Sequence, residues 1–391
     1  MRSVRNTLGR PSIVLFACMF LSQAGLLVLS PILPEVAREF GVATAAAGQL
    51  RTLSGATGGI AAVLLALLPR RPALHTLLSV GAALVGLGAA LSAAASSFAV
   101  LAAAQGAIGV GVGVLVAIAI AAAGEWTAPV DRPRTLAWAI AGMPAAWVVG
   151  MPIAGAAASI DWRVAWLVLP ATTSLVALLL VRLAPRGDRP ATRRCGPAAW
   201  RRPDVARFTT AELLANGAWA GVLTYAGSLL IEGYGAPRGT VSMGLATAAA
   251  AMVPGTVVGR RWAASRAGSS ALAALTLAQG GMVAMLGAVR PGAGVSLGIL
   301  TVMAFVNGWR SVIASGLGMD SAPDDKVTVM SMRAAANQFG YLLGAALGGV
   351  ALAAGGFAAL GAAFSAAFVL GAGLHLAPRL APDPRAAEAA A

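Results

Sequence analysis

The sequence predicts an all-α integral membrane protein with 12 transmembrane helices in two six-helix bundles. Composition, the length of the apolar runs and the distribution of charge lead to this prediction. Of the 391 residues, 58% are hydrophobic and 11% are charged, whereas soluble domains carry about 25% charged residues. So few charges cannot cover a surface that faces water. The lipid bilayer is therefore the expected surrounding of most of the chain.

The apolar runs set the expected helix boundaries, because a helix needs about 20 apolar residues to cross a bilayer. The first six runs lie near residues 12–33, 44–68, 74–95, 98–124, 135–158 and 163–183. The second six lie near residues 207–231, 239–259, 271–289, 293–318, 327–352 and 356–377. We expect an N-terminal bundle over residues 1–183, a linker over 184–206, a C-terminal bundle over 207–379 and a tail over 380–391.

The charged residues orient these helices. The chain has 28 Lys and Arg residues and a net charge of +14. They lie in the gaps between apolar runs and form no basic face with interleaved aromatic residues, so we do not expect nucleic-acid binding. The gaps rich in cations alternate along the chain, as the positive-inside rule describes. Both termini and the linker are therefore expected in the cytoplasm. The bias toward Arg and Ala is typical of a GC-rich bacterial genome, which indicates a bacterial inner membrane.

The N-terminal segment is interpreted as a retained first span. Residues Met1 to Arg10 are basic and lead into the apolar run 12–33. A cleaved signal peptide would have a shorter apolar core of about 7–15 residues and a small-residue cleavage site.

The two halves also share a faint internal repeat. At an offset of 194 residues, Asp131–Arg132 aligns with Asp325–Lys326, and Gly150 and Gly155 align with Gly344 and Gly349. Parallel repeats of six helices, related by a pseudo-twofold axis, are an architecture of membrane transporters. In such proteins the substrate site lies between the repeats near the middle of the bilayer.

Four segments carry a family resemblance. They are the loop Pro31–Val42 after the first helix, Gln49–Thr52 at the start of the second, Gly142–Gly155 in the fifth and Asp161–Trp166 before the sixth. With these segments the whole chain resembles the major facilitator superfamily. The closest likeness is to its twelve-helix, proton-coupled exporters of drugs and metabolites. The resemblance implies a fold of two six-helix bundles and assigns an antiporter motif to Gly142, Gly150, Pro152 and Gly155.

The chain departs from the family pattern at two places. The loop between the second and third helices usually carries Asp-Arg-x-Gly-Arg-Arg, and here only Arg70 and Arg71 remain, as gating candidates. The arginine that usually precedes the Gln-Gly pair of the fourth helix is Ala102, although Gln105 is kept. The family links both missing groups to gating or proton coupling. The resemblance therefore does not define the coupling ion.

Small residues form a stripe on each of two helices. The fifth helix has Gly142, Ala146, Gly150 and Ala154, and the eighth has Gly244, Ala248, Ala251, Gly255 and Gly259. Small residues allow close helix packing in lipid. The resemblance implies that these helices meet across the two halves, so we expect the stripes to form a sliding interface. Ordinary tight packing is an equally compatible interpretation.

Two charges inside the apolar runs require an explanation, because insertion of a charge costs about 2.5–3.5 kcal/mol. Glu212 in the seventh helix and Arg310 in the tenth lie at similar depths from the cytoplasmic side. The family fold turns both helices toward the central cavity. We therefore expect an ion pair that proton binding would weaken, which would bias a two-state rocking motion. The alternative is a static pair that only holds the packing.

Several polar side chains are candidates for lining a substrate cavity. Asn216 and Trp219 share a face with Glu212 through i, i+4 and i+7 spacing. An acid, an amide and an indole on one stripe suit an amphipathic or cationic substrate. The further candidates are Gln23, Gln105, Asn307, Asn337 and Tyr341. Each one alone is equally compatible with a hydrogen bond between helices.

Arg51 is a further gating candidate, several residues into the second helix from the outer side. Glu35 and Glu39 in the preceding loop are available partners, which would make an outer gate. The simpler interpretation is a side chain that snorkels to the membrane interface.

The sequence argues against enzymes and ATP-driven pumps. His75 and His375 lie at the ends of apolar runs with no second ligand nearby, and they are interpreted as interfacial side chains. No span holds a catalytic His/Asp/Glu/Ser cluster, and no Gly-Lys-Ser/Thr nucleotide loop is present. We expect no catalytic residues, metal or cofactor.

The expected function is export of a small molecule, a drug or metabolite, across the cytoplasmic membrane by proton antiport. The expected partners are the substrate, protons and the lipid bilayer, with the protein acting as a monomer. The alternative is an importer or facilitator of a small nutrient on the same fold. The pattern of the fifth helix favours export, through the family resemblance.

Overall fold

The structure is a computed structural model that describes residues 9–67, 72–128, 131–184, 202–263, 268–321 and 326–377. Helices connected by short turns make up this described part, and it contains no β-strand. The predicted all-α architecture is confirmed.

The N-terminal half contains six spans. Its helices are α1 (Arg10–Leu27), α2 (Leu29–Glu39), α3 (Thr44–Leu67), α4 (Leu74–Ala93), α5 (Phe98–Glu125), α6 (Arg132–Ala158), α7 (Trp162–Trp166), the π-helix η1 (Leu167–Ala171) and α8 (Thr172–Val181). Together α1 and α2 make the first span, and α7, η1 and α8 make the sixth. Asp161 begins the sixth span as an N-cap, because its carboxylate accepts the Arg163 backbone N–H at 2.8 Å. The π-helix coincides with Pro170, which has no backbone N–H to donate.

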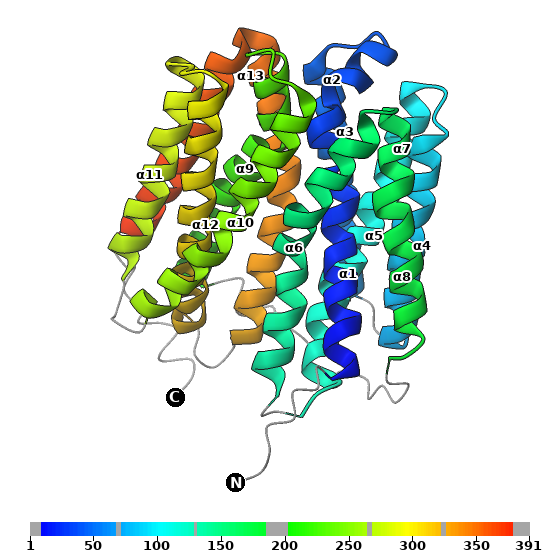
Figure 1. The fold of residues 1–391 in the computed structure, drawn as a ribbon. Helices are drawn as coiled ribbons and strands as arrows, with labels where there is room; N and C mark the ends of the chain where they lie inside the picture. The colour runs from blue at the N-terminus through cyan, green and yellow to red at the C-terminus, as the bar shows by residue number, and fades with distance from the viewer. Residues whose placement is uncertain are drawn as a thin grey trace.

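The C-terminal half contains α9 (Pro203–Ile231), α10 (Arg238–Ala263), α11 (Ser269–Ala288), α12 (Ala293–Ser321) and α13 (Lys326–Leu376). The long α13 is two helices joined at Gly355 and Gly356, where the backbone is not helical. Gly356 has a φ of 64°, in the left-handed region that favours glycine. The chain reverses there, so the second part of α13 runs back past the first (Figure 1).

Ten described segments are long and apolar enough to cross a membrane. One of them, Ala335–Leu376, is the 42-residue segment that contains the Gly355–Gly356 turn. With that segment counted as two spans, and with the 24-residue α3 included, the described chain has the 12 predicted helices.

The two halves stand side by side (Figure 1). We call the end at which α1 begins the lower end and the opposite end the upper end, as drawn in Figure 1. The halves meet chiefly along two helix pairs, α6 with α10 and α3 with α13, and α2 also packs on α9. Gly155 of α6 packs on Ser242 of α10, and Gly349 of α13 packs on Gln49 of α3. Gly155 and Gly349 are 194 residues apart, so the repeat seen in the sequence relates the two pairs by pseudo-twofold symmetry.

The nearest neighbours of the glycines in the two small-residue stripes lie within their own halves. Gly142 faces the Phe16 carbonyl of α1, and Gly150 faces Leu27 and Leu169 within the same half. On α10, Gly244, Gly255 and Gly259 face Leu297, Phe305 and Trp309 of α12. Helices α6 and α10 do pack together, as the resemblance implied. The glycines lie mainly where helices approach most closely inside each half, because a Cβ there would meet the neighbouring helix.

Candidate functional site

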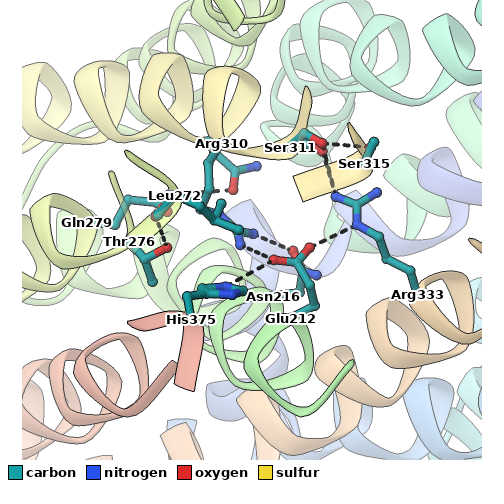
Figure 2. A network of polar contacts seen from close by, with 11 residues as sticks. Glu212, Asn216, Leu272, Thr276, Gln279, Arg310, Ser311, Ser315, Arg333 and His375 are labelled. Atoms are coloured by element: carbon teal, nitrogen blue, oxygen red, sulfur yellow. Dashed lines mark hydrogen bonds and ion pairs between the residues drawn. The ribbon is translucent and has the colours of Figure 1, made fainter. Parts of the chain in front are cut away.

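A buried carboxylate lies at the centre of the polar contacts in the C-terminal half (Figure 2). Glu212 of α9 has no exposed surface. Its Oε1 accepts a hydrogen bond from Arg310 Nη1 of α12 at 2.7 Å, and its Oε2 accepts one from Arg333 Nε of α13 at 2.9 Å. The predicted contact between Glu212 and Arg310 is therefore present, and a second arginine joins it.

Neighbouring polar groups hold both guanidinium groups in place. Asn216, one turn above Glu212 on α9, accepts a hydrogen bond from Arg310 Nη2 at 2.7 Å through Oδ1. Arg333 Nη2 donates to the Ser311 hydroxyl at 3.1 Å. Figure 2 shows the two arginines approaching the carboxylate from different sides. Three helices are thus tied together at one carboxylate.

His375 also faces this carboxylate, so its interpretation as an interfacial side chain is wrong. Only 8% of the residue is exposed, and Nε2 lies 3.8 Å from Glu212 Oε1. The turn at Gly355 and Gly356 brings His375 and Arg333 to the same place from the two parts of α13. We call Glu212, Asn216, Arg310, Arg333 and His375 the Glu212 cluster.

The Glu212 cluster carries an excess of positive charge. With a neutral histidine, two guanidinium groups face one carboxylate, for a net charge of +1. A charge buried in a low-dielectric interior is tolerated only when it is paired and hydrogen-bonded. Both carboxylate oxygens are already bound by cations. This arrangement leaves little for a cationic substrate to bind at Glu212.

A second polar group lies between the two halves. Gln23 of α1 accepts a hydrogen bond from the Trp147 indole Nε1 at 3.2 Å and one from the Tyr341 hydroxyl at 3.4 Å, both through Oε1. Arg51 of α3 donates from Nη1 to the Leu26 carbonyl oxygen. Its guanidinium carbon lies 5.1 Å from the centre of the Tyr341 ring. We call Gln23, Arg51, Trp147 and Tyr341 the central group.

Arg51 has neither the glutamate partners nor the interfacial position that the sequence led us to expect. Glu35 is paired with Arg38 and Arg238, and Glu39 is paired with Arg163 at 2.9 Å. Arg51 itself is only 2% exposed, so it does not snorkel to an interface. Its side chain crosses to α1, where Nη1 donates to the Leu26 carbonyl oxygen, and its guanidinium lies over the Tyr341 ring of α13.

The other predicted site residues lie in different places. Asn307 accepts a long hydrogen bond of 3.5 Å from Gln279 between α12 and α11. Gln105 donates to Ser92 at 3.1 Å inside the N-terminal half, as one of the interhelical hydrogen bonds considered above. Trp219 is partly buried against the hydrophobic core. Pro152 lies half-buried within α6. Arg70 and Arg71 lie outside the described residues.

Sequence reasoning did not place Arg333 and His375 at the Glu212 cluster. The spacing of α13 held a signal, since Arg333, Asn337 and Tyr341 recur every four residues and share one helix face. That face runs from the Glu212 cluster through the half-buried Asn337 to the central group. His375 had no such signal, because only the reversal of α13 brings it close.

The described hydrogen bonds between the halves are concentrated from the central group to the upper end. Arg238 at the start of α10 donates to the Glu35 carboxylate and to the Ala158 carbonyl oxygen. Thr44 donates to Glu232 at 2.7 Å, and Ser30 donates to the Leu223 carbonyl at 2.9 Å. These hydrogen bonds therefore hold the two halves together at the upper end.

Reversing the charge at Arg238 is expected to loosen the upper end. Arg238→Glu would place two carboxylates at Glu35 and remove the donors to Ala158. In a variant without Cys18 and Cys195, a single Ser30→Cys would then react faster with a membrane-impermeant maleimide. We expect roughly a three- to tenfold faster rate, equivalent to a loss of about 0.7–1.4 kcal/mol. Adding Glu35→Arg should restore the slow rate. An unchanged rate in Arg238→Glu would show that this ion pair does not hold the halves together.

Comparison with known proteins identifies the family. A model of the Major Facilitator Superfamily matches residues 15–330. The chain belongs to the major facilitator superfamily. This superfamily member is therefore a secondary active transporter of a small molecule in a membrane, and not an enzyme. No curated protein matches the chain.

Solved structures of other transporters share the fold of this superfamily member. A bacterial homolog of the human lysosomal transporter Spinster, in an inward-facing and unoccupied conformation, is 14% identical with a TM-score of 0.71, and the match covers 95% of this chain and 97% of that chain. A D-xylose–proton symporter is 13% identical with a TM-score of 0.77, and the match covers 95% of this chain and 98% of that chain. At these identities the likeness establishes the two-bundle fold and leaves the substrate open.

Proposed function

We propose that this protein exports a small molecule from the bacterial cytoplasm by antiport with protons, with the Glu212 cluster as the proton-coupling element. The observation that carries the proposal is one fully buried carboxylate bound by arginines from two other transmembrane segments. A buried ionisable group within a span is expensive and marks proton relays in many transporters.

Protonation of Glu212 changes the balance of the cluster. The net charge rises from +1 to +2, and the two guanidinium groups then repel each other without a carboxylate between them. Separation of α12 from α13 would relieve that repulsion. The protonated and deprotonated forms therefore favour different helix arrangements, which is the differential free energy that a two-state transporter requires.

The distribution of charge supports a cytoplasmic lower end. The basic segments of the sequence adjoin the lower ends of the helices, including the start of α1 at Arg10 and the end of α8 at Val181. Positive loops remain on the cytoplasmic side of bacterial membranes. With this orientation, the hydrogen bonds at the upper end belong to a state closed toward the outside. The antiporter motif in α6 favours export.

Transport-linked proton movement tests the coupling. Everted vesicles with an acid interior would receive lipophilic cations, neutral antibiotics and monocarboxylates, and a pH-sensitive dye would report proton release. At least one compound should dissipate the gradient with the wild type. The test variant is Glu212→Gln with Arg333→Gln, because it keeps the net charge of the cluster at +1 and removes the titratable carboxylate. We expect this variant to lose the proton response.

Two controls make the result specific. Vesicles without the protein report the passive effect of permeant acids and bases. The variant must still bind the active compound, measured as a shift in its melting temperature. A double variant that moves protons like the wild type would rule out coupling through Glu212. Substrate uptake that follows its own gradient, independent of pH, would indicate the facilitator. Movement of the substrate out of the everted vesicles together with protons would indicate the importer.

A further inference from the structure

The central group contains a buried cation without a counter-ion. Arg51 is 2% exposed, and no described acidic side chain pairs with it, since Glu35 and Glu39 bind other arginines. A buried charge of this kind is strongly unfavourable unless an opposite charge and hydrogen bonds compensate for its lost hydration. The guanidinium group has three nitrogens that can donate hydrogen bonds. One of them, Nη1, donates to the Leu26 carbonyl oxygen.

The two remaining nitrogens form one edge of the guanidinium plane. Arg51 Nε and Nη2 are both buried and have no hydrogen-bond partner among the described residues. They lie side by side on the planar group, in the geometry that accepts the two oxygens of a carboxylate through parallel N–H···O bonds.

Gln23 supplies a third donor without a described partner in the same central group. Its Oε1 must be the atom that faces Trp147, because an indole N–H can only donate. This fixes the orientation of the amide and leaves Nε2 buried without a partner in the described part of the chain. Gln23 lies one turn from Leu26 on α1, and Tyr341 contacts both Gln23 and Arg51. The unused donors therefore belong to one place in the structure.

We propose that Arg51 and Gln23 bind the carboxylate of a monoanionic substrate with an apolar or aromatic body. The proposal rests on the proposed function only in taking the protein to carry a small molecule. A single guanidinium group neutralises one negative charge, which favours a carboxylate over a phosphate dianion. The Trp147 and Tyr341 rings beside these donors suit an apolar body. An inside-negative membrane potential also drives an anion outward, in the direction of export.

The position of the site between the halves explains how it opens. Arg51 and Gln23 belong to the N-terminal half, whereas Tyr341, which covers the guanidinium face, belongs to the C-terminal half. A rocking movement that separates α3 from α13 would remove Tyr341 from the guanidinium face and give a ligand access to Arg51. The same face of α13 carries Arg333 eight residues earlier, about 12 Å away at 1.5 Å per residue. A change at the Glu212 cluster that moves α13 would therefore also move Tyr341.

Melting temperatures of the purified protein test the assignment. Formate, acetate and benzoate would be compared with the matching amides and with chloride at equal ionic strength, and phosphate and sulfate would form separate arms. We expect benzoate to raise the melting temperature of the wild type by about 2–5 °C, acetate to act more weakly, and the amides and chloride to have no effect. Arg51→Met should abolish the benzoate effect. Arg51→Lys, which keeps the charge and loses the fork, should need at least about tenfold more benzoate.

The unliganded proteins provide a second readout that needs no substrate. If the free edge of Arg51 is kept for a ligand, Arg51→Met should melt about 2–4 °C higher than the wild type without ligand, because an uncompensated charge is removed. A lower melting temperature for Arg51→Met would show a structural arginine and overturn the proposal. The proposal also fails if no carboxylate acts, if phosphate or sulfate acts more strongly, or if benzoate acts equally on Arg51→Met.

The outcome is independent of proton coupling. The Glu212→Gln, Arg333→Gln variant should keep the benzoate effect, since neither residue touches the free edge of Arg51. Loss of the Arg51-dependent effect, with proton release still dependent on Glu212, would overturn only the carboxylate site. Retention of the effect without proton coupling would overturn only the antiport mechanism.

Discussion

Replacing Glu212 with glutamine is expected to destabilise the C-terminal half more than any other single change at the cluster. The substitution keeps the size of the side chain and leaves the buried Arg310 and the half-buried Arg333 without a counter-ion. Breaking a buried pair in this way costs about 3–5 kcal/mol, which would lower the apparent Tm by roughly 10 °C. The measurement is thermal unfolding of the purified protein in one detergent.

Matched variants separate the electrostatic cause from the loss of hydrogen bonds. Glu232→Gln makes the same chemical change at an exposed residue that accepts a hydrogen bond from Thr44, and it should change the stability by no more than about 0.5 kcal/mol. Adding Arg333→Gln to Glu212→Gln should recover most of the lost stability, because the cluster returns to a net charge of +1. If the double variant is no more stable than the single one, charge imbalance is not the cause.

Replacing Gly344 with alanine is the second change expected to have a large effect. Helices α9 and α13 cross closely at this residue, and a Cβ would overlap the Gly217 carbonyl oxygen and lie 2.8 Å from Gly221 N. Both neighbours are backbone atoms, so only a shift of a whole helix makes room. Overpacking of this kind costs about 1–3 kcal/mol or more. We expect a fall in Tm of several degrees and a loss of transport.

Gly281→Ala is the matched control, because Gly281 lies exposed within α11 with nothing within 4 Å of an added Cβ. Alanine is the better helix former by about 0.8–1 kcal/mol, so this variant should be at least as stable as the wild type. Equal effects at the two glycines would mean that α9 and α13 have room to accommodate a methyl group at their crossing.

The positions of the spans were predictable because the thickness of the bilayer sets the length of each apolar run, whatever the rest of the chain does. The reversal near residue 355 was also visible, as the gap between the last two predicted runs, 327–352 and 356–377. The contact between Glu212 and Arg310 was predictable for a related reason. Similar depth in the membrane and the cost of an unpaired charge left few partners for either residue.

The contacts of Arg51 show where sequence reasoning ends. Nearness along the chain favoured Glu35 and Glu39 as its partners. Glu35 instead pairs with arginines of its own helix and of α10, and Glu39 pairs with an arginine of α7. The side chain of Arg51 follows the direction of its own helix face, and this direction leads to Leu26 and Tyr341. The rotation of a helix about its own axis decides which partners its buried side chains meet. In a chain rich in Ala and Gly, the hydropathy pattern specifies this rotation only weakly.

By itself, the sequence determined the membrane class, the twelve spans, the two-bundle organisation and the Glu212–Arg310 contact. Only the tertiary structure decided that Arg333 and His375 complete the Glu212 cluster and that Arg51 and Gln23 keep donors without a described partner. Hydropathy and depth are properties of each segment, and they can be read along one helix at a time. The partners of a buried side chain depend on how several helices rotate and cross. The close packing of their backbones determines these rotations and crossings for all the helices together.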